Sequence, residues 1–481
     1  MSARANLLVT STVLTLLCSL AATEVAAQAI TVAPADPVIF VGQPQQFTVI
    51  GIDTATAIEA GTFHQCALLQ DTTVRCWGEN DYGQLGRGTI SSPPETPNPT
   101  PVAVVGLTGV AAVSGGAFHT CARFPNGTLQ CWGRNSEGQL GDPATTGFAS
   151  ATPVPVTDIT TATVVTGGGY HTCALLQNGT VRCWGQNDYG QLGDGTLTPT
   201  FVPNRTPVQV FGITTAVAVS AGGFHTCALL ADSTIRCWGQ NNRGQLGDGT
   251  TTNAVTPITT PASPRPTPMP VTVSGITTAV AIEAGAFHTC ALLRDGTMQC
   301  WGWNDYFQLG TSTSSFNYSS VPVTVSGIRP AALAPGAEHT CVLLPDGTVR
   351  CWGDNGYGQL GNGSQRGVYA PNEAAVVTGI TTAVAATSGA EHTCALLRDG
   401  RVQCWGRGLF GRLGDGRDRN SPEGDAFTPV TVVGIGATWT SSDTTVATID
   451  ATGLATGLSP GSTTITATSG GRSGGTSLFV Q

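Results

Sequence analysis

The sequence predicts an all-β protein in which seven similar units form one closed array. The first observation is a motif that recurs seven times, about every 55 residues, along a chain of 481 residues. The second is the composition: 63 glycines, 29 prolines and only 11% charged residues are typical of short strands joined by many turns. The third is that no long stretch shows the periodicity of an amphipathic helix.

Each unit contains two β-prone runs on either side of a short turn. In the third unit this turn is Gln177-Asn178-Gly179. Asn followed by Gly favours a type I turn closed by a left-handed glycine, which makes a three-residue hairpin. The hairpin places Cys173 directly opposite Cys183. The first and fourth units have Thr72 and Ser233 in place of the glycine, and neither favours a left-handed backbone.

The cysteines predict seven disulfides, one in each unit. Fourteen of the fifteen cysteines form pairs ten residues apart, and each second cysteine is followed by Trp-Gly. Opposed residues at a non-hydrogen-bonded position bring their Cα atoms close enough for a disulfide. The pairs are Cys66–Cys76, Cys121–Cys131, Cys173–Cys183, Cys227–Cys237, Cys290–Cys300, Cys341–Cys351 and Cys394–Cys404.

A zinc site is the alternative interpretation of these residues. His171 and Cys173 share a strand face and Cys183 lies opposite, so three ligands could meet one ion. The histidines all occupy this one repeat position, which favours a structural role over catalysis, and we expect no cofactor. The glycine-rich segment after each Trp-Gly, such as 187–195, could bind calcium or phosphate, but a tight turn in every unit is the simpler interpretation. Counting free thiols on the secreted protein would separate disulfides from zinc.

Residues 1–29 predict a secretory signal peptide. Arg4 supplies the positive start, residues 7–22 form an apolar run, and Ala27-Gln28-Ala29 offers a cleavage site. The unpaired Cys18 lies inside this segment. We therefore expect a secreted, periplasmic or cell-surface protein, in a compartment where paired thiols become disulfides. No later segment is apolar enough to span a membrane.

The repeat resembles that of the regulator of chromosome condensation family. The resemblance rests on the pattern His-x-Cys-Ala-Leu-Leu-x-x-Gly-Thr-Val-x-Cys-Trp-Gly-x-Asn-x-x-Gly-Gln-Leu-Gly, whose two halves recur in seven copies. It implies a seven-bladed β-propeller over residues 51–435, each blade a four-stranded sheet. The cysteine pair departs from the intracellular family and indicates a secreted, cross-linked form, similar to secreted bacterial propellers that bind proteins or inhibit enzymes.

The two ends of the chain resemble parts of one further domain. Residues 436–481 resemble the later strands of the bacterial immunoglobulin-like group 2 domain, and residues 30–50 resemble its opening strands. We therefore expect a propeller inserted into a loop of a small immunoglobulin-like β-sandwich, because a closed ring brings its ends together. The alternative is that the ends are two unrelated fragments.

The net charge of −9 and the pI of about 5.2 argue against nucleic acid, which needs a basic face. The sequence favours a monomeric interaction module, an adhesin or an inhibitor, whose ligand is a protein or a glycan. Guanine nucleotide exchange is the alternative that the family resemblance implies, and a polysaccharide-acting enzyme is another. No catalytic constellation is visible, since no paired carboxylates or Ser-His-Asp set stands out.

Departures from the repeat mark the candidate binding surface. Trp303 replaces a polar residue of the other units, and Phe307 replaces a glycine. Exposed aromatic side chains with interspersed arginines are typical of binding hot spots. The candidate surface consists of Trp303, Tyr306, Phe307, Phe316, Tyr318, Arg407, Phe410 and Arg412.

Overall fold

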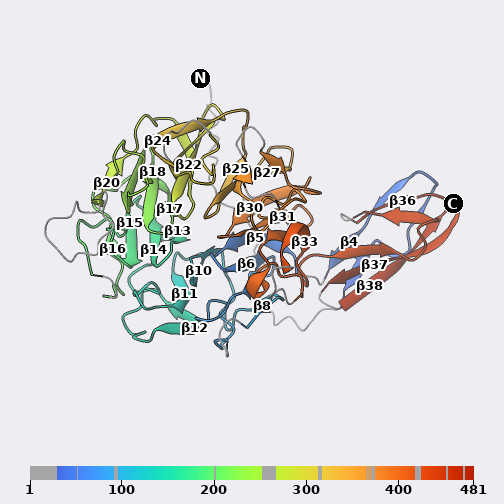
Figure 1. Cartoon of the computed structure of the whole chain (residues 1–481). Coiled ribbons are helices and arrows are strands. Elements are labelled where there is room, and N and C mark those ends of the chain that lie inside the picture. The colour runs from blue at the N-terminus through green and yellow to red at the C-terminus, as the bar shows by residue number, and fades with distance from the viewer. Residues whose placement is uncertain are drawn as a thin grey trace, which may run out of the picture.

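The protein is a seven-bladed propeller with a small β-sandwich at its side, as seen in a computed structural model (Figure 1). The blades follow one another around the ring in chain order, so that the last blade lies beside the first. Among the described residues, no helix is long and apolar enough to cross a membrane. The structure describes residues 30–50, 53–91, 96–199, 202–251, 267–311, 317–365, 368–369, 374–417, 424–450, 453–469 and 472–481.

Each blade is an antiparallel sheet made from one continuous stretch of chain. Blade one comprises β5 (Ala55–Ala60), β6 (His64–Leu69), β7 (Val74–Gly78) and β8 (Val102–Ala103). Blade two comprises β9 (Ala112–Gly115), β10 (His119–Arg123), β11 (Leu129–Arg134) and β12 (Ala149–Pro155). Blade three comprises β13 (Ala162–Gly167), β14 (His171–Leu176), β15 (Val181–Gly185) and β16 (Val208–Gln209). Blade four comprises β17 (Ala216–Ala221), β18 (His225–Leu230), β19 (Ile235–Gly239) and β20 (Thr267–Thr272).

The remaining three blades repeat this order. Blade five comprises β21 (Ala279–Ala284), β22 (His288–Leu293), β23 (Met298–Trp303) and β24 (Tyr318–Val325). Blade six comprises β25 (Ala332–Pro335), β26 (His339–Leu343), β27 (Val349–Asp354), β28 (Val368–Tyr369) and β29 (Ala375–Val376). Blade seven comprises β30 (Ala383–Ser388), β31 (His392–Leu397), β32 (Val402–Gly406) and β33 (Ala426–Thr431), with the 3-10 turn η2 (Leu409–Gly411) before β33.

The predicted hairpin register is confirmed. In blade three, Cys173 is paired with Cys183, and the amide of Gly179 donates to the carbonyl of Leu176. Gly179 has φ 78°, the left-handed value that the turn requires. Thr72 and Ser233 adopt the same conformation, each with φ 67°, so the turn keeps its shape even without glycine.

The fourteen cysteines form the seven predicted disulfides, with Cα atoms 4.0–4.1 Å apart. The structure does not show the alternative zinc site, because its candidate ligands are engaged in other bonds. The sulfur atoms of Cys173 and Cys183 are bonded to each other, and Nε2 of His171 is hydrogen-bonded to Oγ1 of Thr226 in the next blade.

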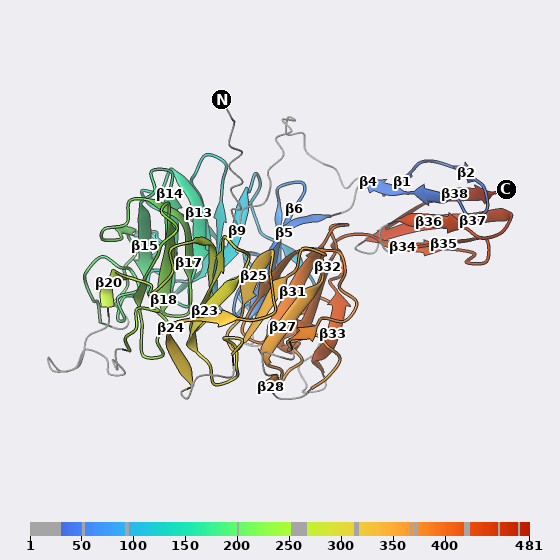
Figure 2. The same ribbon diagram turned by 90° about the horizontal axis from the view of Figure 1, so that it is seen from above.

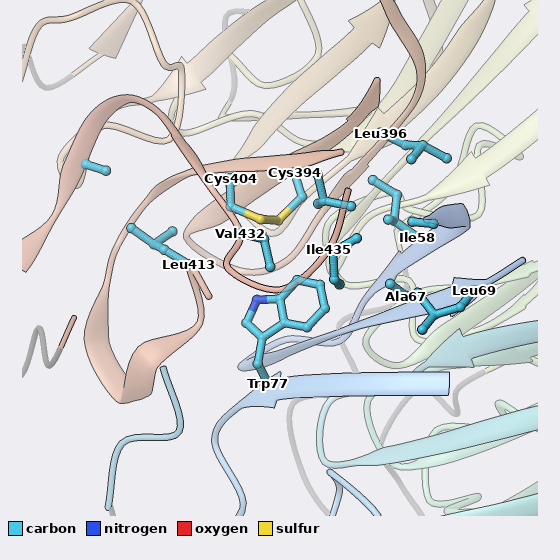
Figure 3. Packing of buried hydrophobic residues seen from close by; sticks show 13 residues of the cluster. Ile58, Ala67, Leu69, Trp77, Cys394, Leu396, Cys404, Leu413, Val432 and Ile435 are labelled. Carbon is cyan, nitrogen blue, oxygen red and sulfur yellow. A yellow bond between two sulfur atoms is a disulfide. The ribbon is translucent and has the colours of Figure 1, made fainter. Parts of the chain in front are cut away.

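Neighbouring blades are held together by a repeated apolar cluster. Between blades seven and one, Trp77 packs against Leu413, Val432 and the Cys394–Cys404 disulfide (Figure 3). The indole N–H of Trp77 also donates to the carbonyl of Arg412 at 3.0 Å. The six other tryptophans that follow a cysteine make the same bond to a glutamine carbonyl of the preceding blade, at 2.9–3.1 Å. Each tryptophan therefore fills an apolar gap and satisfies its one donor.

The two ends of the chain form one sandwich beside blade seven (Figure 2). Its core includes Ile30, Val32 and Phe47 from the N-terminal part and Ile465 and Leu478 from the C-terminal part. One sheet has the order β2 (Val38–Ile39), β38 (Arg472–Val480), β37 (Gly461–Ser469), β34 (Thr438–Ser441). A second has the order β3 (Pro44–Gln46), β36 (Leu454–Gly457), β35 (Ala447–Ile449), and β1 (Thr31–Ala33) pairs with β4 (Thr48–Ile50).

Candidate functional site

One end of the propeller carries a ring of side chains around its axis. The ring consists of the residue before each repeat histidine, at the start of the second strand of every blade. All seven side chains are half-buried. We call these residues the mouth ring: Phe63, Phe118, Tyr170, Phe224 and Phe287 from blades one to five, and Glu338 and Glu391 from blades six and seven.

The five aromatic members of the mouth ring form a continuous arc. Neighbouring ring centroids lie 5.3, 5.7, 6.0 and 6.2 Å apart, from Phe63 to Phe287. Such spacings are those of interacting aromatic pairs. The arc is positioned because each member lies next to a buried histidine on a strand that the disulfide and the hairpin hold in register.

A second layer of aromatic side chains stacks on the outside of the arc. Tyr82 lies edge-on to Phe118 at 5.3 Å, and Tyr189 does the same to Phe224 at 5.5 Å. Trp303 lies 5.6 Å from Phe287. Arginines are interleaved with these rings: the guanidinium of Arg134 lies 5.0–5.6 Å from four ring centroids, those of Tyr82, Phe118, Phe148 and Tyr170.

In blades six and seven the mouth ring carries carboxylates, Glu338 and Glu391, in place of aromatic side chains. Burial, with Asp354, Glu391 and Asp305 nearby, raises the pKa of Glu338 to about 7. Its nearby charge in turn raises the pKa of the Tyr306 hydroxyl. The negative charge of Glu391 is instead compensated by two ion pairs, with Arg407 at 2.8 Å and with Arg412 at 3.3 Å.

A ring of buried histidines supports the mouth ring from below. In six blades, Nε2 of the histidine is hydrogen-bonded at 2.8–2.9 Å to a threonine hydroxyl of the next blade. Burial lowers the pKa of these six histidines to about 3 or 4, so they are neutral structural residues. The seventh step differs, because blade one has Gln65 in place of threonine. Neither ring nitrogen of His392 and neither amide atom of Gln65 has a hydrogen-bond partner in the described part of the chain.

The predicted binding residues of blade five lie together on this end of the propeller. Trp303 contacts Tyr306, with ring centroids 5.5 Å apart, and pairs with Tyr318 across β23 and β24. Phe307 has φ 63°, a left-handed conformation that costs a bulky residue free energy and that the glycine of other units adopts freely. Phe316 lies outside the described residues.

In blade seven, two of the predicted binding residues lie partly exposed at the mouth-ring end of the propeller, and the third is buried. Arg407 lies 4.4 Å from the ring centroid of Tyr357, and Phe410 is half-buried with φ 63°. Arg412 is fully buried, so it was wrong to expect it on an exposed surface. It occupies the position of a buried glutamine in the other blades, and its guanidinium lies 5.2 Å from the ring centroid of Phe63.

The aromatic members of the mouth ring were missed by sequence reasoning. Their signal is nevertheless present, since an aromatic residue precedes the histidine in five consecutive units, as in Phe118-His119 and Tyr170-His171.

Elsewhere the described residues show little that resembles a catalytic centre. They contain no group of three or more His, Cys, Asp or Glu side chains that could hold a metal ion. Glu59 and Glu283 lie on the inner strands β5 and β21, and burial together with Glu283 raises the pKa of Glu59 to about 8. A pocket of about 350 Å³ at the opposite end of the propeller is lined by Arg329, Arg350 and a single carboxylate, Asp346.

Family models match most of the propeller. A model of the RCC1-like domain matches residues 162–457. Two models of the regulator of chromosome condensation (RCC1) repeat match residues 55–84 with 110–139, and 73–123 with 126–175.

The chain is similar to proteins of varied function. It is 29% identical over 372 residues to the ultraviolet-B receptor UVR8 of Arabidopsis thaliana, covering 76% of this chain and 80% of that protein. It is 29% identical to the human E3 ubiquitin-protein ligase HERC2 over 72% of this chain, but over only 7% of that protein. Among solved structures, Prp20p of Saccharomyces cerevisiae superimposes with a TM-score of 0.63 at 19% identity, covering 79% of this chain and 87% of that one. Human WBSCR16 superimposes with a TM-score of 0.63 at 22% identity, covering 75% and 94%.

Proposed function

This chain belongs to the RCC1-like domain family, and from that premise we propose that it is a binding module without catalysis that receives a macromolecular ligand on its mouth ring. The observation that carries the proposal is the aromatic arc from Phe63 to Phe287, with its second layer of rings. Partly exposed aromatic side chains with arginines between them supply large contact area at low entropic cost, which is the composition of binding hot spots.

The strain at Phe307 supports the same surface. A left-handed phenylalanine persists only where the surrounding structure holds it, and such residues concentrate at functional sites. Glycine fills this position in the six other blades and would remove the strain. The half-buried Phe307 follows Tyr306 in the chain, and this departure from the glycine of the other blades makes it a candidate for ligand contact.

We propose that the protein acts outside the cytosol, after removal of residues 1–29. Two features support export: the signal-like composition of that segment, and seven buried disulfides, which persist in oxidising compartments. The cross-linked repeat further favours the secreted bacterial type of this family. We also propose that the protein works as a monomer, since the ring is closed by its own seven blades.

For the sandwich we propose an immunoglobulin-like group 2 domain into which the propeller is inserted, with residues 30–50 and 436–481 as its two parts and residues 51–435 as the insert. Its support is the pairing of Val38 with Phe479 and of Gln45 with Ala455, which joins opposite ends of the chain. The domain that it resembles is common in surface proteins, and the sandwich would present the propeller to its ligand.

The other activities have weaker support. Prp20p is described by its binding to Gsp1p and histones, but at 19% identity the likeness shows the fold alone, and the proposed export would separate this chain from an intracellular GTPase. The match to HERC2 covers a small region of that ligase. A polysaccharide-acting enzyme would need at least two convergent carboxylates in a pocket, and the pocket beside Asp346 is lined by a single carboxylate.

The test is ligand capture by the oxidised protein, followed by substitution on the mouth ring. Trp303→Ala and Phe224→Ala should each weaken capture of the same ligand at least tenfold, which is the usual effect at a hot spot. Phe211→Ala is the matched control, because Phe211 is 62% exposed and lies outside the mouth ring. Unchanged affinity in both mouth-ring variants, with normal melting curves, would reject this surface.

A further inference from the structure

The mouth ring changes its chemistry at two boundaries, one between blades five and six and one between blades seven and one. Around five blades it presents aromatic faces, and between Phe287 of blade five and Glu338 of blade six it switches to carboxylates. Trp303 and Tyr306 extend the aromatic side of this boundary, while Asp305 and Asp354 extend the acidic side.

The carboxylate of Glu338 is unpaired in the part of the chain that the structure describes. Among the described residues, no donor or cation lies within hydrogen-bonding or ion-pair distance of it. The nearby cations are directed elsewhere: Arg407 and Arg412 pair with Glu391, and Arg243 lies 3.6 Å from Asp305. Glu338 is thus a half-buried acidic group surrounded by like charges.

The aromatic side of the boundary already accommodates a cation. The guanidinium of Arg243 lies 5.2 Å from the ring centroid of Trp303, within the range of a cation–π contact. An aromatic wall facing an unpaired carboxylate favours an organic cation, because the rings attract its charge and contact its alkyl stem. A neutral sugar would leave the charge of Glu338 uncompensated.

We propose that the mouth ring recognises an arginine or lysine side chain of a partner polypeptide, seated between Trp303, Tyr306 and Phe287 on one side and Glu338 and Asp354 on the other. This inference rests on the proposed function, since it names the chemistry of the ligand that the same surface would take. The cation neutralises Glu338, and the rest of the peptide lies along the aromatic arc.

The titration of Glu338 supports this arrangement. The groups that face it are Asp354 on its own blade, Asp305 and Tyr306 from blade five, and Glu391 from blade seven. They and burial raise its pKa to about 7, and a bound cation lowers it again. Affinity for a basic peptide should therefore rise between pH 6 and pH 8, while the buried histidines stay neutral throughout.

The test is selection of a random dodecapeptide library on the immobilised, oxidised full-length protein, followed by titration of the selected peptides. We expect peptides rich in arginine or lysine, whose affinity falls about tenfold or more in Glu338→Gln, as expected for loss of a charge-assisted contact. We also expect Glu338→Gln to abolish the rise in affinity between pH 6 and pH 8.

The matched control is Asp346→Asn, which removes one negative charge from the opposite end of the same blade. Asn already fills this turn position in blades two and three, as Asn126 and Asn178, so folding should be unaffected. This variant should bind the selected peptides like the parent protein.

The other outcomes overturn the inference in distinguishable ways. Neutral or acidic peptides that still lose affinity in Trp303→Ala would leave the binding surface standing and reject its cationic ligand. Basic peptides that bind Glu338→Gln with unchanged affinity would do the same. Binding on a glycan array, lost in Trp303→Ala and without selected peptides, would replace the polypeptide by a carbohydrate. Failure of every probe to respond to Trp303→Ala would reject the proposed function itself.

Discussion

Replacing Gln65 by threonine should stabilise the protein, because it completes a ring of hydrogen bonds that the chain leaves open. Six blades join their histidine to a threonine of the next blade at 2.8–2.9 Å. By the same repeat, Gln65 faces His392, and both side-chain amide atoms of Gln65 and Nε2 of His392 are buried without a hydrogen-bond partner among the described residues. Gln65→Thr would supply the hydroxyl that His392 lacks and remove the unpaired amide.

The magnitude follows from the cost of buried polar groups. A buried donor or acceptor without a partner costs about 1–3 kcal/mol. With the lower value for the three groups, and about 1 kcal/mol lost to the volume that threonine leaves empty, the net gain is about 2 kcal/mol. In a protein of this size that free energy should raise the melting temperature by about 2 °C.

The assay is thermal unfolding at pH 8, followed by circular dichroism, of the parent protein and two variants. Thr226→Gln is the matched opposite change, since it breaks the existing bond to His171 and should lower the melting temperature by a similar amount. A melting temperature that is unchanged or lower in Gln65→Thr would refute the reasoning and show that the Gln65 amide is already satisfied.

Three further predictions concern acid, the hairpin turns and the sandwich. The free energy of unfolding should decrease as the pH falls from 6.5 towards 4. Burial lowers the pKa of the histidines in the folded protein, so each histidine takes up its proton only on unfolding. Each therefore lowers the free energy of unfolding by about 1.4 kcal/mol at pH 5.5. Glu59, whose pKa is raised to about 8, has the opposite effect on stability, but it is one group against seven histidines. Melting curves that coincide at pH 8 and pH 5.5 would contradict the prediction. Ser233→Gly should stabilise the fold by about 1 kcal/mol in urea titrations by relieving a left-handed serine, whereas Gly179→Ser should destabilise it similarly. Truncation after Ile435 removes the partners of Val32 and Phe47, so limited proteolysis with mass spectrometry should show residues 30–50 digested while the propeller stays intact; protection of that segment would argue against the shared core.

Much of the fold could be predicted because its signals are local. The ten-residue spacing of Cys173 and Cys183 and the turn at Gly179 determine a hairpin register without any knowledge of the rest of the molecule. The turns at Thr72 and Ser233 kept the same geometry although their residues disfavour it, since disulfide and ladder hold the strands in place.

The candidate site was predicted less completely. Trp303 and Tyr306 stood out because they break the repeat, and the structure places them in contact. Arg412 was misjudged, since sequence does not reveal that its loop position points into the interface where other blades bury a glutamine. Nor could it show that the carboxylate of Glu338 would lack a cation, because the arginines that could reach it are directed to other carboxylates.

The sequence by itself determined the seven units, their hairpins and their disulfides, because each depends on residues within about a dozen positions of one another. Only the tertiary structure decided what the units make together. Phe63 and Phe118 are 55 positions apart in the chain and meet because closure of the ring sets equivalent positions of adjacent blades side by side. The aromatic arc, its acidic boundary at Glu338 and the open hydrogen bond at Gln65 all arise from that closure, which no single repeat contains.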